Sequence, residues 1–469
     1  MATPQAKKST PSKVPHVFAL LFIITVIMAL LTWVIPAGQF DRAEDPVTGR
    51  TLVVPNSYHA IEPNPQGIAD IFTAVVSGWE QAATMIFMVF FIGGMLKMLE
   101  DTGTMKLGLA HMSNALKGKE VIALILVTTI MSLGGATGAF ANPVVALIPV
   151  GIALAKGLGY DPLVGFSIIY LGAYSGFNVG FANVFTIGIA HTIAEIPKFT
   201  GLGVRILLQI ICLLLTLQHI IRYANKIKKD PTASLTYDLE TEHDNVDILE
   251  DLAPFTTTHA IIAVIAFAAF GLLTYGAVNL GWGISQFSAI FLAAAVIIGL
   301  VGGLGVNGTA RTFVKGCSGM AYAALVIGMA RSISVVMQQG NIIDTVIYWL
   351  SLPITAVGPL IGANLMYVAN IVINFFIPSG SGQAVTVMPI MVPLADIAGI
   401  SRQVACQAFQ FGDGFSNIII PTASTVMASL GIAGVPYERY VRWVWPLLLK
   451  FFLIGFVTLT LGVMFNWGP

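Results

Sequence analysis

Residues 121–155 read VIALILVTTIMSLGGATGAFANPVVALIPVGIALA, and no charged side chain occurs among them. The glycine-rich stretch 134–138 and the pair Asn142-Pro143 interrupt the run near its middle. The interruption leaves two apolar arms of roughly 14 residues each, and at about 1.5 Å per residue neither arm crosses a ~30 Å hydrocarbon layer. The stretch therefore predicts a re-entrant helix–turn–helix hairpin that enters and leaves the membrane on the same side.

The composition of the whole chain agrees with a membrane setting. Of its 469 residues, 56% are hydrophobic and only 10% are charged, whereas soluble domains average about 25% charged residues. So few charges cannot cover a water-facing surface, which excludes a soluble enzyme, a nucleic-acid-binding protein and a disordered chain. The 47 glycines also fit, because glycine is more frequent in membrane helices than in soluble ones. We expect a lipid bilayer as partner and no nucleic acid.

The positions of the charges predict the topology. Lys7, Lys8 and Lys13 precede an apolar run at 16–37 that has no signal-peptide cleavage site and is long enough to span a bilayer. By the positive-inside rule the N-terminus is cytoplasmic. The acidic segment that follows is then an external loop. A short amphipathic stretch and then an apolar span at about 82–98 are expected next.

The second half of the chain repeats the first. Asn183 and Thr422, like Pro197 and Pro436, lie 239 positions apart, and interrupted apolar segments recur at matching places. We predict an all-α polytopic membrane protein with about nine transmembrane helices plus two re-entrant hairpins, in two inverted repeats with broken helices. The expected parts are the N-terminal tail, first transmembrane helix and external loop (1–67), inverted repeat 1 (68–229, hairpin 121–156), an acidic cytosolic linker (230–256), two connecting transmembrane helices (257–303) and inverted repeat 2 (304–469, hairpin 360–398).

Interrupted segments at matching positions of two repeats point to the binding site of a secondary transporter. A half-helix that begins at membrane depth offers free N–H groups to a carboxylate, and one that ends there offers carbonyl groups to a cation such as Na⁺. The candidate substrate-binding residues are Thr137, Asn142, Asn178, Asn183, Thr186, Ser379, Gly380, Ser381, Gly382, Gln383, Thr422 and Ser424. The candidate ion-coupling residues are Asp413, Ser416, Asn417 and His191, with Asp413 as a possible Na⁺ ligand.

Structural roles compete with these assignments, because polar side chains also bridge membrane helices by hydrogen bonds. Asp413 either coordinates Na⁺, accepts a proton or caps a half-helix. His191 either titrates or is a buried structural residue, and Arg331 either extends to the membrane surface or pairs with a carboxylate. Asn370 and Asn374 share a face of the second hairpin, where they can pack against the neighbouring break.

Enzymatic readings are disfavoured. Ser379 and Ser381 with His191 suggest an intramembrane serine protease, but the glycine order differs from the one such enzymes use. Residues 410–413 (QFGD) lack the first glycine of the G-x-G-D motif of aspartyl intramembrane proteases. No glycine-rich loop with Lys-Ser/Thr supports ATP coupling, and the three cysteines lack metal-ligand spacing. We expect no cofactor beyond a coupling ion, Na⁺ or H⁺.

The segments 376–384 (FIPSGSGQA), 409–416 (FQFGDGFS) and 421–422 (PT) closely resemble the YfcC-type branch of the C4-dicarboxylate uptake C family, and 133–136 and 190–197 resemble its first-half motifs. The resemblance covers nearly the whole chain. It implies the ion transporter superfamily, with a scaffold domain and a moving transport domain in a homodimer. It also implies ion-coupled or exchange transport of small carboxylates or amino acids.

Two departures bear on the substrate. Relatives that handle basic amino acids carry an acidic pair where this chain has Asn142-Pro143, and Asn-Pro-Phe with a nearby Gln where it has 183–185 (NVF) and His191. A cationic substrate would lose its counter-charge, which costs several kcal/mol at membrane depth. The sequence favours a secondary active transporter, a symporter or exchanger, of a small carboxylate-bearing solute such as a C4-dicarboxylate, in the bacterial cytoplasmic (inner) membrane. An arginine/ornithine antiporter is the alternative, and a channel is less favoured.

Overall fold

A computed structural model describes residues 17–44, 51–54, 56–105, 107–108, 111, 118–138, 140–141, 144–183, 185–197, 200–239, 254–280 and 282–468. Within these ranges the chain forms seventeen α-helices and two small two-stranded sheets. The predicted helical membrane architecture is confirmed. The described part of the loop after the first helix adds two short strand pairs, one enclosed by the other.

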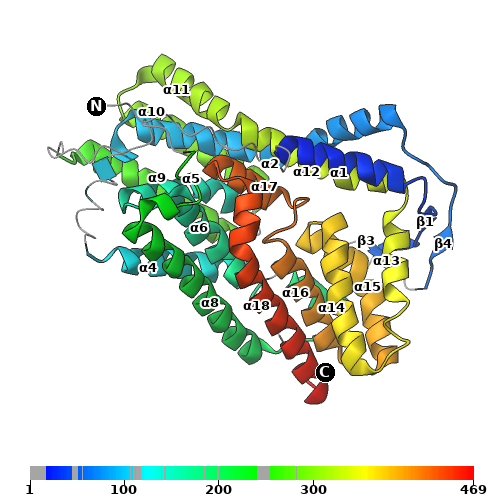
Figure 1. The fold of residues 1–469 in the computed structure, drawn as a ribbon. Coiled ribbons are helices and arrows are strands. Elements are labelled where there is room, and N and C mark those ends of the chain that lie inside the picture. Colours follow the sequence, from blue (N-terminus) through cyan, green and yellow to red (C-terminus); the bar gives the residue numbers. More distant parts are fainter. Residues whose placement is uncertain are drawn as a thin grey trace, which may run out of the picture.

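One group of helices lies along the upper side of Figure 1. It contains α1 (Val17–Leu31), α2 (Ile68–Asp101), α10 (Ile284–Val301), α11 (Gly305–Gly319) and α12 (Ala321–Gln339), and α9 (Thr257–Asn279) packs on α10. Glycines bring these helices close together, as small residues do in membranes. A Cβ on Gly78 of α2 would lie 2.7 Å from the carbonyl oxygen of Gly328 in α12. A Cβ on Gly316 of α11 would lie 2.4 Å from the carbonyl oxygen of Gly93 in α2.

The second group contains the same series of elements twice: a helical hairpin, a broken helix and a long helix. The first series is α4 (Glu120–Ala136), α5 (Val144–Gly157), α6 (Pro162–Phe177), α7 (Ile187–Ile193) and α8 (Leu202–Lys229). The second is α14 (Pro359–Phe376), α15 (Gly380–Ala398), α16 (Arg402–Ser416), α17 (Ser424–Ala433) and α18 (Tyr437–Met464), and α13 (Ile343–Ser351) precedes it. Hairpins and breaks therefore lie where the sequence predicts them.

The two series pack against each other reciprocally. The short helix α17 contacts α5 and α6, and α7 contacts α15 and α16. Such an exchange is what a two-fold relation between the halves would produce. The inverted orientation of the repeats in a membrane, and the division of the chain at the predicted boundaries, stay predictions.

Two expected elements differ from the structure. The run at 16–37 was expected to be one membrane helix, but α1 ends at Leu31, where the Thr32 hydroxyl donates to the carbonyl of Ala29 (2.6 Å) and a turn leads to Pro36. The expected amphipathic stretch and the apolar span at 82–98 are parts of one element. One 34-residue helix, α2, covers both, because its interior glycines serve helix packing and do not break it.

Six helices in the described chain are long and apolar enough to span a membrane: α2, α8, α10, α14, α15 and α18. The bent pair formed by α11 and α12, which meet at 46°, would make a seventh. The expected number of nine spans is not confirmed, because α1, α6, α7, α16 and α17 are each shorter than 18 residues.

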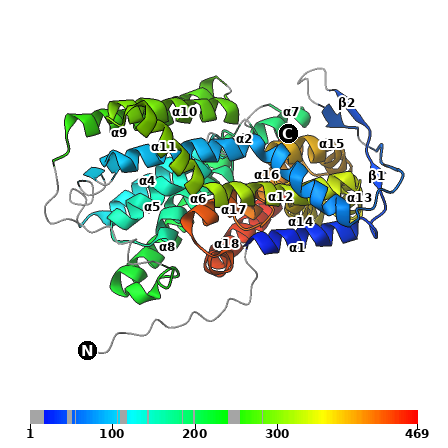
Figure 2. The same cartoon turned by 90° about the horizontal axis from the view of Figure 1, so that it is seen from above.

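Two strand pairs follow α1 at one end of the molecule. Strand β1 (Gly38–Gln39) pairs with β4 (His59–Ala60), and β2 (Arg42–Glu44) pairs with β3 (Thr51–Val53). We call the described residues 38–44, 51–54 and 56–60 the flap. It lies beside α13 and α15 in both views (Figures 1 and 2).

The acidic linker is partly docked on the helices. The Ser234 hydroxyl donates to Asp161 Oδ2 (2.7 Å), and the Arg439 guanidinium donates to Asp238 Oδ2 (2.8 Å). Residues 240–253 of the linker lie outside the described residues.

Candidate functional site

The two broken helices meet at their breaks, and each caps the other. Helix ends leave carbonyl groups without partners inside the helix. The carbonyl of Phe177, at the end of α6, accepts from Gln410 Nε2 of α16 (2.7 Å). In turn, Tyr170 of α6 donates its hydroxyl to the carbonyl of Asn417, at the end of α16 (3.0 Å). The breaks therefore form one structural unit.

Asp413 lies at the centre of this unit and is fully buried. Its Oδ1 accepts from Asn417 Nδ2 (2.9 Å), whereas Oδ2 has no hydrogen-bond partner among the described residues. Asn374 of α14 donates to the carbonyl of Asp413 (3.0 Å) and to Ser416 Oγ (2.7 Å). Asn370 packs against Gly412, so both asparagines contact the neighbouring break as their spacing suggested.

The tip of the second hairpin approaches Asp413 at Gly380. A Cβ on Gly380 would lie 2.8 Å from Asp413 Oδ2 and 2.5 Å from Thr186 Cγ2. Only glycine fits without displacing one of these groups. The hairpin tip, the start of α7 and the Asp413 carboxylate thus converge, and the Thr186 hydroxyl also has no partner in the described part of the chain.

A cavity of about 560 Å³ opens beside this convergence, and we call it the inner cavity. It is bounded by both breaks, by the hairpin tips, and by α2, α10 and α12. Its lining residues are Gln81, Ala82, Thr84, Met85, Ala141, Tyr174, Phe177, Phe185, Thr186, Ile284, Ile327, Arg331, Pro378, Ser379, Gly380, Ser381, Asn417, Ser424 and Thr425.

Arg331 gives the inner cavity its charge. Its side chain is the one charged group among the described residues of the lining, which include no aspartate or glutamate. Arg331 Nε donates to Gln81 Oε1 (3.2 Å). A half-buried guanidinium without a counter-ion is costly, and a carboxylate is the ligand that best matches its planar donor geometry. The cavity is therefore suited to an anion.

Six of the predicted site residues line the inner cavity: Thr186, Ser379, Gly380, Ser381, Asn417 and Ser424. Asp413 and Ser416 lie directly behind them. Gly382 instead lines a neighbouring cavity beneath the flap. Asn142 lies outside the described residues.

The other predicted residues lie in the framework around the cavity. Thr137 donates to the carbonyl of Gly134 (2.8 Å), Asn183 Oδ1 accepts from the N–H of Phe185 (2.9 Å), and Gln383 Nε2 donates to Asn370 Oδ1 (3.0 Å). Asn178, Thr422 and His191 are buried, and none of them is among the described residues that line either cavity. A role in ligand binding stays a prediction for these six residues.

Sequence reasoning missed part of the lining. Arg331 was weighed as a carboxylate partner but not assigned to the site, although a charge within an apolar helix is a functional signal. Gln81 and the pair Tyr174–Thr425, whose hydroxyl groups are 3.1 Å apart, carried no such signal. Gln81 comes from α2, whose approach to the breaks is decided by packing, whereas Tyr174 and Thr425 lie on the broken helices α6 and α17 themselves.

Coupling ions would have to bind through oxygen atoms here. Within the described ranges no group of three or more His, Cys, Asp or Glu side chains could hold a metal ion. Asp413 Oδ2 and Thr186 Oγ1, both without a partner in the described chain, are oxygen atoms of a type that can bind Na⁺, and a carboxylate can also bind H⁺.

A comparison with known protein families decides the family. The family described as C4-dicarboxylate anaerobic carrier (DcuC) matches residues 14–464. The chain belongs to the DcuC family. The resemblance carried by the motifs around Gly380 and Asp413 is thereby confirmed, and the chain is a multi-pass membrane transporter.

Curated relatives cover nearly the whole DcuC-family chain. An uncharacterized protein of Haemophilus influenzae is 29% identical over 98% of both chains. YfcC of Escherichia coli (strain K12), whose name proposes a basic amino acid antiporter, is 28% identical over 94% of both chains.

Among solved structures, the YdaH transporter of Alcanivorax borkumensis is 19% identical to this DcuC-family chain, with a TM-score of 0.41, and covers 97% of this chain and 100% of its own. MtrF of Neisseria gonorrhoeae, described as illuminating a class of antimetabolite efflux pumps, is 17% identical, with a TM-score of 0.43 and coverages of 97% and 96%.

Proposed function

We propose that the protein is a secondary active transporter of a small carboxylate-bearing solute, with a C4-dicarboxylate as the leading class. The observation that supports this most is Arg331, a cation facing a polar cavity whose described lining contains no acid. Family membership supports transport of this kind but leaves the substrate open.

In this proposal the inner cavity binds the substrate from two sides. Arg331 and Gln81 hold one carboxylate from α12 and α2. Ser379, Gly380 and Ser381 hold the other end of the solute at the start of α15, where free N–H groups and the helix dipole favour negative charge. Ser424 at the start of α17 contributes in the same way.

Coupling is proposed to run through Asp413. Its Oδ2 and the Thr186 hydroxyl are both without partners in the described chain. Asp413 Oδ2 and the methyl group of Thr186 both lie close to Gly380. A buried carboxylate in this position requires a neutralising partner. Na⁺ would bind to these oxygens and to carbonyl groups at the end of α16, or H⁺ would neutralise Asp413 directly.

The remaining parts of the proposal concern the setting. The charge distribution supports a bacterial cytoplasmic membrane protein with a cytoplasmic N-terminus. The family resemblance supports a homodimer and a scaffold domain distinct from a moving transport domain. The reciprocal packing of α7 and α17 supports two inverted repeats.

Uptake by purified protein in proteoliposomes tests the proposal. Labelled C4-dicarboxylate should accumulate above its equilibrium level when a Na⁺ or pH gradient, or an unlabelled counter-substrate inside the vesicles, is provided. If no gradient and no counter-substrate drives accumulation of any small carboxylate, the proposed function is wrong. Uptake that always stops at equilibrium would favour a channel.

An antiporter of basic amino acids is the second candidate, and the name of the Escherichia coli relative favours it. Vesicles preloaded with arginine or ornithine would then take up labelled arginine, and dicarboxylates would not compete. Arg331, which has no acidic neighbour among the described residues of the lining, argues against a substrate with a cationic side chain, because like charges would face each other at low dielectric.

A further inference from the structure

A second cavity, of about 460 Å³, lies between the flap, α12, α13 and the start of α15, and we call it the flap cavity. Arg331 and Ser379 line both cavities, so the two cavities share a wall. The flap cavity is also lined by Arg42 of the flap and by Asp344 of α13. The two cavities are therefore neighbours, with Arg331 and Ser379 between them.

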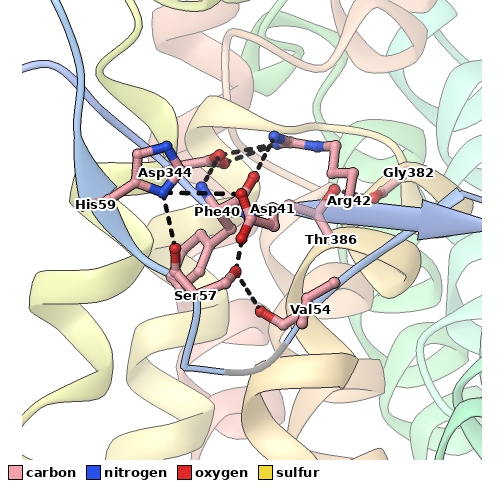
Figure 3. A network of polar contacts seen from close by, with 9 residues as sticks. All are labelled: Phe40, Asp41, Arg42, Val54, Ser57, His59, Asp344, Gly382 and Thr386. Carbon is pink, nitrogen blue, oxygen red and sulfur yellow. Dashed lines mark hydrogen bonds and ion pairs between the residues drawn. The ribbon is translucent and has the colours of Figure 1, made fainter.

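The flap holds Asp344 in the way that a binding site holds a carboxylate ligand. Arg42 NH2 donates to both carboxylate oxygens, at 3.0 Å to Oδ1 and 2.9 Å to Oδ2 (Figure 3). The backbone N–H of Phe40 donates to Oδ2 as well (3.0 Å). Asp344 is only 5% exposed. A guanidinium and a backbone N–H are donor groups that commonly bind carboxylates in proteins.

The charges in this lining are unequal. Two guanidinium groups, those of Arg42 and Arg331, face the flap cavity, but only one carboxylate, that of Asp344, does so among the described residues. The start of α15 adds a helix N-terminus beside Arg42, near Gly382 and Thr386 (Figure 3). The described lining of the cavity therefore carries more positive than negative charge, which attracts anions.

Asp344 does not depend on Arg42 alone. It lies in the first turn of α13, where the helix dipole stabilises a negative charge, and the Phe40 N–H contacts it independently. A second carboxylate can therefore replace it on Arg42 without leaving Asp344 wholly uncompensated.

We propose that the flap cavity is a separate binding site for a small dicarboxylate, with Asp344 as a tethered competitor for Arg42. One carboxylate of the ligand replaces Asp344 on Arg42, and the other meets Arg331 on the shared wall. This inference rests on the proposed function for the identity of the ligand, and it adds a second binding site on the flap side of the transport site.

Two single substitutions distinguish a competitor role of Asp344 from a purely structural role, in which the ion pair with Arg42 only holds the flap in place. If the Arg42–Asp344 pair only fastens the flap, Asp344→Asn and Arg42→Gln break the same contact and shift dicarboxylate affinity in the same direction. If Asp344 competes with the ligand, the two shifts are opposite. Asp344→Asn removes the competitor and should tighten binding by about tenfold, whereas Arg42→Gln removes the receptor group and should weaken it by about tenfold or more.

The measurement is equilibrium binding of a labelled C4-dicarboxylate to the purified full chain in detergent, with thermal unfolding of every variant as a check on folding. Arg42→Lys keeps the charge and should bind better than Arg42→Gln. Asp41→Asn is the matched control, because Asp41 lies in the flap, faces His59 at 3.8 Å and is not part of the described cavity lining. Its affinity should equal that of the wild type.

The outcomes distinguish this inference from the proposed function. Opposite shifts in folded variants support the tethered competitor. Parallel shifts, or no shift in either variant, overturn it while wild-type uptake still supports dicarboxylate transport. If the wild type neither binds nor accumulates dicarboxylates, the proposed function fails and this inference falls with it.

Discussion

Arg331→Gln tests the inner cavity most directly. The substitution removes the one charged group among the described residues of that lining, while it keeps a polar side chain that can still reach Gln81. A hydrogen bond to a charged group contributes about 1.5–3 kcal/mol, and each ~1.4 kcal/mol is a factor of ten in affinity. We therefore expect the apparent KM for a dicarboxylate to rise by roughly 10- to 150-fold.

The assay is initial-rate uptake into proteoliposomes under a fixed driving gradient, with KM and Vmax measured separately. Arg331→Lys should fall between the wild type and Arg331→Gln, because an ammonium group keeps the charge but loses the planar donor fork. Arg311→Gln is the matched control, since Arg311 is exposed on α11 and does not line the inner cavity.

Thermal stability distinguishes a substrate-binding role of Arg331 from a structural one. Removing a half-buried charge whose only described acceptor is a glutamine should leave the melting temperature unchanged or raise it. An unchanged KM in Arg331→Gln, or an equal rise in Arg311→Gln, would refute carboxylate recognition by Arg331. A large fall in stability would instead assign Arg331 a structural role.

Three further predictions concern coupling, packing and pH. Asp413→Asn should remove the dependence of uptake on Na⁺ or pH gradients while leaving the protein folded, and unchanged ion dependence would exclude Asp413 from coupling. Gly176→Ala would place a Cβ 1.9 Å from a carbonyl oxygen of α4 and should cost about 1–3 kcal/mol in thermal unfolding, whereas Gly203→Ala, with open space around it, should be neutral or stabilising. The pKa of Asp238 lies below its ordinary value because Arg439 donates hydrogen bonds to it, so this pair stabilises above about pH 4 and is lost as pH falls through the lowered pKa. Because the pair is partly exposed, the free energy of unfolding of the wild type should exceed that of Asp238→Asn by less than about 1 kcal/mol at pH 7. A difference in unfolding free energy that persists at pH 2 would contradict the ion pair.

The hairpins and broken helices could be predicted because their signals are local. Runs without charge that are interrupted by glycine, asparagine and proline predict helical hairpins. The arms of the first hairpin, α4 and α5, have 17 and 14 residues, whereas those of the second, α14 and α15, have 18 and 19 and are long enough to span a membrane. The long helix α2 could not be predicted in the same way. Gly78 and Gly93 lie inside α2, at the points where α12 and α11 approach it closely.

The candidate site likewise has a part that could be predicted from the sequence and a part that could not. Thr186 and Asp413 lie at the breaks and Gly380 lies at a hairpin tip, and all three were predicted from the sequence. The opposite wall, with Gln81 and Arg331, is formed by residues 250 positions apart that meet only through helix packing. The Arg42–Asp344 pair, 302 positions apart, depends on how the flap folds back over α13. Neither arrangement leaves a local pattern in the sequence.

The hydrogen bonds at the breaks also constrain how the cavity can open. Gln410 caps α6 and Tyr170 caps α16, so separating the two breaks would leave two buried carbonyl groups without partners. Each would cost about 1–3 kcal/mol, and more where lipid replaces water. On the opposite wall the inner cavity itself separates the breaks from Arg331 and Gln81. Separating the two breaks from each other therefore costs more than moving them together as one body.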